Sequence, residues 1–406
     1  MKYMRFKGFQ TRRAIILSSL LNEPFATLYP LLPFILLKSL NATPFQIVLL
    51  IMLKPISSIF SFYWSEKISQ DRHTLKANLL GAGLLARLPF LFALCFNNVS
   101  LLIGASIIYM LFSRAGIPSW MEILKLNLPE KVREKSFSFG AALGHAEGVF
   151  IAIGVGSLLD QSVISWKIFF AIALAFGLIA LIIQACLPIA EINRKEKPLE
   201  KATLKETFIR PWVDCYELMK SRPDFRRFQW AFMIGGFGLM VIQPVIPIFF
   251  TETLHISYRD LLIAFSICKG LGFVLTSSLW SRGLSYFSVS KFTAIVLFGF
   301  ALFPALISLA VVHTYWIYVA YFVYGIAQAG SHIIWHLSGP LFAGGEKSAR
   351  YSGVNILMVG IRGFLGPPLG GLLALLLGAV PVFIFSSVLC ICGIAPLSRL
   401  RLTISK

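Results

Sequence analysis

The sequence predicts an all-α, polytopic membrane protein with about 12 transmembrane helices in two parallel six-helix repeats. Three observations predict this class: an apolar composition, long apolar runs along the whole chain, and an internal repeat. Of the 406 residues, 57% are hydrophobic and only 14% are charged, whereas a soluble domain carries about 25% charged residues. Lipid is therefore the expected solvent for most of the chain.

Apolar runs long enough to cross the hydrocarbon core recur between short polar breaks. A helix that crosses this core needs about 20 mainly apolar residues. The first run is longer than the core of a signal peptide and no small-residue cleavage site follows it, so we expect a membrane helix there. The expected spans are 14–37, 44–65, 75–96, 99–121, 138–159, 165–189, 228–251, 258–281, 290–312, 314–338, 352–377 and 380–397.

The 37 lysine and arginine residues are distributed unevenly around these spans. When the span edges are counted with the breaks, twenty-nine lie at the N-terminus or in the breaks on its side, three lie in the opposite breaks, and five lie well inside spans. Short loops rich in lysine and arginine stay cytoplasmic. We therefore expect both termini in the cytoplasm and the protein in the cell (inner) membrane. The formal net charge of +19 is then a topology signal and does not predict nucleic-acid binding.

Similar residues recur along the chain at an offset of 214 to 216. Each pair stands at the same place relative to its expected helix, which predicts two parallel halves. We expect an N-terminal half at 1–190, a cytoplasmic linker at 191–227 and a C-terminal half at 228–406. The matching pairs are 29–34 with 243–248, Lys54 with Lys269, Trp64-Ser65 with Trp280-Ser281, and Glu130-Lys131 with Glu346-Lys347.

The linker carries ten basic and seven acidic residues, so we expect it to be solvated. Its segment 211–219 has two interpretations. It is either a plain tether, which we favour, or an amphipathic helix on the membrane surface.

Glycine-rich spans and one loop pattern resemble those of a known family. Glu66 and Lys67 keep the charge order of the family's pattern between helices two and three, and the fifth and eleventh spans are rich in glycine. On these features and the repeat, the chain resembles the major facilitator superfamily. That resemblance implies a transporter in which helix five packs beside helix eight and helix eleven beside helix two. The glycines are Gly140, Gly144, Gly148, Gly154 and Gly156, then Gly360, Gly363, Gly366, Gly370 and Gly371.

Ionisable side chains inside the spans are candidates for function because each costs at least about 2.5 kcal/mol to insert. We expect most of them near the middle of the bilayer, where superfamily substrates bind. Arg87 is left out because helix three is peripheral in the family, so that its head group would reach the interface or pair with a loop. The candidates are Glu23, Lys54, Arg114, Glu147, Lys269 and Arg362.

The two carboxylates inside the spans of the N-terminal half have different interpretations. Glu23 shares a helix face with Ser19 and Thr27, which we expect to line a polar cavity. It is either a proton carrier or a fixed counter-ion for Arg114, which resembles an arginine of proton-coupled family members. Glu147 lies on the glycine face of helix five and is expected to form a salt bridge with Lys269 between the halves.

The cations predict an anionic substrate. The repeat places Lys54 and Lys269 at one depth, where they would form a two-sided positive site. The alternative is that each pairs with a carboxylate, but away from their edges the spans hold five cations and only two such acids.

One face of helix ten is typical of a recognition surface. Aromatic rings next to hydrogen-bonding groups suit an organic solute, whereas a lipid-facing helix would carry leucine, isoleucine and valine. Gln243, which opens the repeated segment of helix seven, is a further candidate. The helix-ten face consists of Tyr321, Tyr324, Gln328, His332 and Trp335.

The sequence therefore predicts a secondary transporter that moves a small organic solute, favoured as anionic, by alternating access. A drug/proton antiporter is the alternative within transport, and a transport-dead receptor is a further one. No Walker phosphate loop occurs, and the spans lack the paired aspartates of a membrane enzyme, so no enzyme activity is expected. We expect a monomer in the lipid bilayer, without metal or cofactor, with protons as the candidate coupling ion.

Overall fold

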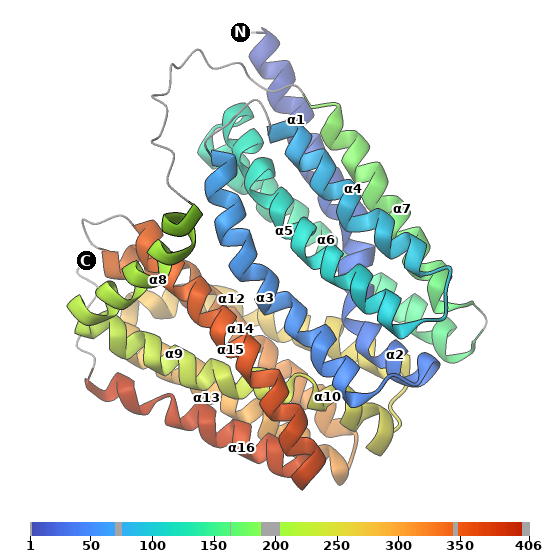
Figure 1. Cartoon of the computed structure of the whole chain (residues 1–406), viewed down its shortest axis with the longest axis vertical. Helices are drawn as coiled ribbons and strands as arrows, with labels where there is room; N and C mark the ends of the chain where they lie inside the picture. Colours follow the sequence, from blue (N-terminus) through green and yellow to red (C-terminus); the bar gives the residue numbers. More distant parts are fainter. Residues whose placement is uncertain (1, 70–74, 163, 188–203, 344–347, 400–406) are drawn as a thin grey trace. The chain divides into compact units, whose positions relative to one another are not determined.

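The computed structural model describes residues 2–69, 75–162, 164–187, 204–343 and 348–399 (Figure 1). These residues form helices joined by short turns, and no strand occurs among them. Ten helical segments in this part of the chain are long and apolar enough to cross a membrane. The two remaining predicted spans lie in α3 (Pro44–Ser69) and α6 (Glu130–Asp160). The all-α, polytopic class with about 12 transmembrane helices is therefore confirmed.

The other helices follow the predicted spans closely, with a few spans divided into shorter pieces. Their bounds are α1 (Lys2–Leu28), η1 (Tyr29–Leu31), α2 (Leu32–Leu40), α4 (Leu75–Ala93), α5 (Val99–Asn127), α7 (Trp166–Ala185), α8 (Leu204–Ser221), α9 (Pro223–Ile242), α10 (Val245–Ile248), η3 (Phe249–Thr253), α11 (Tyr258–Leu262), η4 (Ile263–Cys268), α12 (Lys269–Tyr286), α13 (Val289–Ser308), η5 (Leu309–Val311), α14 (Tyr315–Ala343), α15 (Ser348–Leu377), α16 (Ala379–Cys392) and η6 (Ala395–Arg399).

The chain forms two compact units. Unit 1 comprises Met1–Ala42, Phe60–Lys201 and Ser257–Leu262, and unit 2 comprises the rest. One boundary falls inside α3 and another falls between α11 and η4. The division expected from the repeat, at 190 and 228, remains a prediction.

Unit 1 is held together by aromatic packing and by hydrogen bonds between helices. Phe25 of α1 contacts Phe90 of α4 and Phe170 of α7, with ring centroids 5.4 and 5.8 Å apart. The amide of Gln184 donates to the hydroxyl of Ser18 at 3.2 Å, inside the protein. At the end of α6, a Cβ on Gly156 would lie 2.8 Å from the Cα of Arg259 in α11. Helix five therefore packs beside helix eight, as the resemblance implied.

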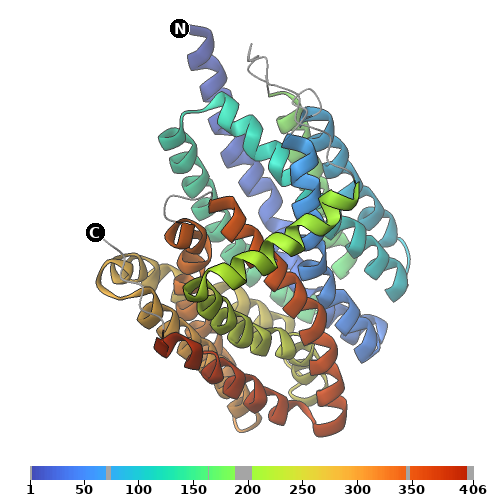
Figure 2. The same ribbon diagram turned by 60° about the vertical axis from the view of Figure 1, so that its left-hand side comes forward.

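Unit 2 contains several close approaches between helices at glycines. Gly363 and Gly360 of α15 lie against Pro55 and Ile59 of α3, so helix eleven packs beside helix two, as expected. Gly370 of α15 contacts the backbone of α9, and these two helices run side by side in Figure 2. Small residues allow such approaches, which strengthen packing where lipid supplies no hydrophobic force between helices.

The crossing of α12 and α14 gives a direct test of this packing. A Cβ on Gly272 would collide with the carbonyl oxygen of Phe322, whereas one on Gly270 would enter open space. We expect Gly272→Ala to lower the apparent unfolding temperature in detergent, because overpacking costs about 1–3 kcal/mol. Gly270→Ala is the matched control and should be neutral or stabilising, since alanine favours helix by about 1 kcal/mol. Equal losses in both variants would contradict the crossing.

Both copies of the repeated proline segment interrupt their helices. The first copy forms the 3₁₀ turn η1, between α1 and α2. The second copy separates α9 from α10 and leads into the π-helical segment η3. A second π-helical segment, η4, directly precedes Lys269. Such interruptions free backbone groups and are frequent at functional sites.

Candidate functional site

The polar stripe of α1 packs against the glycine face of α6. A Cβ on Gly140 would lie 2.8 Å from Oγ of Ser19, and one on Gly148 would lie 2.9 Å from Oγ1 of Thr27. Thr27 is buried. Larger residues on α6 would hold the two helices apart, so the glycines allow the polar stripe of α1 to contact α6. The stripe was expected to line a cavity; its described neighbour is α6.

Two carboxyl groups meet within this seam. A Cβ on Gly144 would lie 2.9 Å from Oε2 of Glu23, and Glu147 stands one helical turn further along the same α6 face. The carboxylate of Glu23 is close enough to Glu147 to repel its negative charge. The Oε2 atom of Glu147 is buried and has no hydrogen-bond partner in the described part of the chain. The sequence predicted Lys269 as the partner of Glu147, and that pairing remains a prediction.

Arg114 was expected either to pair with Glu23 or to have a functional role. Its side chain is half-buried on α5, and it forms no ion pair or hydrogen bond with any residue that the structure describes. The counter-ion interpretation of Glu23 therefore has no support from Arg114.

The expected position of the Arg87 head group is wrong. Its guanidinium neither extends to the interface nor pairs with a loop. It donates to Oδ1 of Asn22 at 2.6 Å and to the carbonyl oxygen of Gly83 at 3.0 Å, and it lies against Gly177 of α7. Asn22, the polar residue next to Glu23 on α1, was the sequence feature that could have indicated this contact.

The two repeat-related lysines belong to the same unit. Lys269 begins α12, and it lies close enough to Lys54 for the like charges to repel. Lys54 is exposed and Lys269 is half-buried. Lys269 forms no ion pair among the described residues. The two-lysine site for an anion remains a prediction.

Arg362 is the most deeply buried of the candidate cations, with 9% of its surface exposed. Its Nη1 donates to the carbonyl oxygen of Phe232 at 2.7 Å, and the guanidinium lies 5.3 Å from the centre of that ring. The side chain crosses α9 at Gly236, where any Cβ would collide with it. Its Nε is buried without a hydrogen-bond partner in the described residues. A buried donor of this kind is a candidate for an anionic ligand.

The aromatic face of α14 divides into two parts. Tyr321 is buried, and its ring contacts Phe265 at 4.8 Å and Phe303 at 5.2 Å, so it belongs to the packed interior and not to an open cavity wall. Trp335 stacks on Phe232 at 5.8 Å, the ring that also carries Arg362.

The remaining α14 candidates lie along the same helix. Tyr324 is half-buried and within electrostatic range of Arg362. His332 is exposed, with its ring 6.0 Å from Phe273, and Gln328 is half-buried. Gln243 is half-buried at the interruption between α9 and α10. Among the candidate cations of unit 2, Arg362 is thus the one that lies among aromatic rings in the described part of the chain.

Comparisons with known proteins agree with the all-α membrane fold. The family model described as Major Facilitator Superfamily matches residues 24–365. A mutant form of the nucleoside transporter NupG has a similar structure, with a TM-score of 0.74 and 14% identity over 97% of this chain and 99% of that chain. A POT family transporter in complex with a thioalcohol-conjugated peptide gives 0.72 and 14% over 94% of each chain. A comparison with curated proteins gave no match.

A third solved structure is described as inward-facing and unoccupied. It is a bacterial homologue of the human lysosomal transporter Spinster, with a TM-score of 0.61 and 14% identity over 97% of this chain and 96% of that chain. At such identities, these likenesses concern the fold alone.

Proposed function

The chain belongs to the Major Facilitator Superfamily and is a multi-pass membrane transporter, not an enzyme, and we propose that it carries a small organic anion by alternating access. The observation that carries this proposal is that two cations of unit 2, Lys269 and Arg362, each form no ion pair within its described residues. An uncompensated cation inside a membrane protein is costly. An incoming anion would supply the missing partner.

The aromatic rings beside Arg362 favour an organic anion over an inorganic one. Trp335 and Phe232 form a stacked pair next to Arg362, and Tyr324 lies within range of the same guanidinium. A flat apolar surface with few polar groups binds the body of an organic molecule, while the cation fixes its charged end. The solved neighbours include a nucleoside transporter and a POT family transporter bound to a peptide conjugate, and both solutes are organic.

A thermal-shift screen tests the substrate class directly. Purified protein would be heated with matched sets of anionic, neutral and cationic metabolites. We expect anionic compounds to raise the apparent unfolding temperature, since a ligand at 100 times its Kd stabilises by about 2.7 kcal/mol. If cationic compounds alone stabilise the protein, the anion proposal is wrong.

Proton coupling is the second part of the proposal. Glu23 and Glu147 face each other across the seam of α1 and α6, and like charges this close do not both ionise easily. One carboxyl would then hold a proton that can be released when the seam changes. The same feature favours the alternative, a drug/proton antiporter. A transport-dead receptor would bind ligand without vesicle uptake, which separates it from both.

The orientation in the membrane is also proposed from the charge asymmetry. We propose that both termini and the segment around Lys205 lie in the cytoplasm of a cell whose inner membrane holds the protein as a monomer. A Lys205→Cys variant, in a background without other exposed cysteines, should react with an impermeant maleimide only after the cells are opened. Labelling from outside intact cells would contradict this topology.

A further inference from the structure

Helix α8 has two apolar faces, and unit 2 buries only one of them. Leu218 is 1% exposed and packs into the core of the unit, with Cys215 and Met219 beside it. The opposite face carries four residues with exposed fractions from 42% to 69%. They follow the spacing i, i+3, i+4, i+7 of a single helix face. We name this set the α8 stripe: Ile209, Trp212, Val213 and Tyr216.

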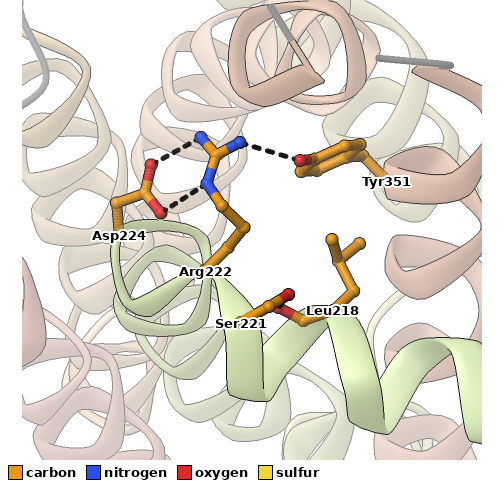
Figure 3. Close-up of polar contacts among 5 residues, drawn as sticks. All are labelled: Leu218, Ser221, Arg222, Asp224 and Tyr351. Atoms are coloured by element: carbon orange, nitrogen blue, oxygen red, sulfur yellow. Dashed lines mark hydrogen bonds and ion pairs between the residues drawn. The ribbon is translucent and has the colours of Figure 1, made fainter.

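A polar network joins the junction of α8 and α9 to α15, on the side where Leu218 is buried (Figure 3). The guanidinium of Arg222 donates to both carboxylate oxygens of Asp224, at 3.1 and 2.9 Å. Its Nη1 donates to the hydroxyl of Tyr351 on α15 at 2.9 Å. The hydroxyl of Ser221 donates to the carbonyl oxygen of Leu218 at 3.3 Å. The bond to Tyr351 and the burial of Leu218 hold this end of α8 against unit 2 with the stripe on the exposed side.

The stripe lies next to the end of a membrane span. Helix α9 begins at Pro223, one residue after Arg222, and it opens a candidate span. Two turns into α9, Trp230 is 51% exposed, and Arg226 and Arg227 are exposed before it. Exposed tryptophan and arginine at a helix end are typical of the boundary between lipid and water.

We propose that the α8 stripe inserts into the headgroup region of an anionic bilayer. Tryptophan and tyrosine on one face, with basic residues beside them, are typical of helices that lie in this interface. The basic residues are Arg210 and Lys220 on α8, together with Arg226 and Arg227. The segment 194–227 holds ten basic residues against six acidic ones. Lipid phosphates complement this excess, and each basic residue near such a surface strengthens attraction to it.

Spin-label accessibility in proteoliposomes tests the proposal on the full chain. The six native cysteines would be replaced and one label placed at Tyr216→Cys. The matched control is Glu217→Cys, the next residue, which is exposed and lies about 100° further around the helix. In bilayers containing phosphatidylglycerol, we expect the label at 216 to collide more with oxygen than with a water-soluble nickel complex. The label at 217 should show the opposite preference.

Three results would overturn the proposal. Free access of the nickel complex to position 216 would place the stripe in water, and protection from both reagents would place it under protein, either this chain or a second copy. An unchanged oxygen preference in pure phosphatidylcholine would remove the role of lipid charge. If Tyr216→Cys does not reconstitute, Ile209→Cys reports on the same face and is held to the same outcomes.

Discussion

Replacing Lys269 with glutamine is expected to weaken binding of the anionic substrate by about tenfold or more, which corresponds to at least about 1.4 kcal/mol. The lysine has no described acidic partner in unit 2, so the anion would be its main source of compensation. Removing one partner of a buried charge pair costs about 2–5 kcal/mol. Titration of the purified variants with the best anion from the thermal-shift screen measures the change.

Three further variants give this experiment its controls. Lys291→Gln removes the same charge from an exposed position on α13 and should leave the Kd unchanged. Lys54→Gln should weaken binding as Lys269→Gln does, because the two ammonium groups are neighbours. Lys54→Arg should also be tolerated poorly, since a planar guanidinium differs from a compact ammonium. A cationic substrate whose transport survives both glutamine changes would show that the lysines belong to the scaffold.

Glu23→Gln is expected to abolish accumulation driven by a proton gradient, so that the internal substrate concentration never exceeds the external one. The amide keeps the shape of the carboxyl but cannot release a proton. Exchange of labelled for unlabelled substrate, which needs no net proton movement, should continue. Uptake and exchange by the same proteoliposomes separate the two effects.

Controls for this variant come from the neighbouring carboxyl and from α5. Glu147→Gln should impair coupling as well, because it removes the group that faces Glu23. Glu122→Gln removes a carboxylate that already pairs with Lys125 at 3.7 Å, and it should behave as the unchanged protein does. If Glu23→Gln fails to fold and Arg114→Gln restores folding, Glu23 is a structural counter-ion and not a proton carrier.

The sequence predicted the fold well because a bilayer restricts what a chain can do. Every backbone group within lipid must be satisfied internally, so apolar runs of about 20 residues can form only helices or closed barrels. The apolar runs also placed helices two and five, α3 and α6, which carry Lys54 and Glu147. The packing of Gly363 on Pro55 and of Gly156 on Arg259 came from the family resemblance.

The contacts of individual side chains were harder to predict, because helix rotation and depth are not contained in hydropathy. The spacing of Tyr321 and Trp335 put them on one face, but Phe265 and Phe303 bury the first ring. Arg87 was discounted by its helix, although Asn22 holds it inside unit 1. Glu147 was matched with Lys269 from the packing of helices five and eight that the resemblance implies, and this pairing stays a prediction. The contact with Glu23 was not foreseen, and the glycines of α6 allow it.

Substrate uptake by proteoliposomes containing only this chain tests the central claim most directly. A radiolabelled organic anion, selected by thermal shift, would be supplied outside vesicles with and without an imposed proton gradient. We expect saturable uptake that exceeds empty vesicles, rises with the gradient and falls in the Lys269→Gln protein. Specific binding with no uptake in either condition would contradict a transporter and leave a receptor built on the same fold.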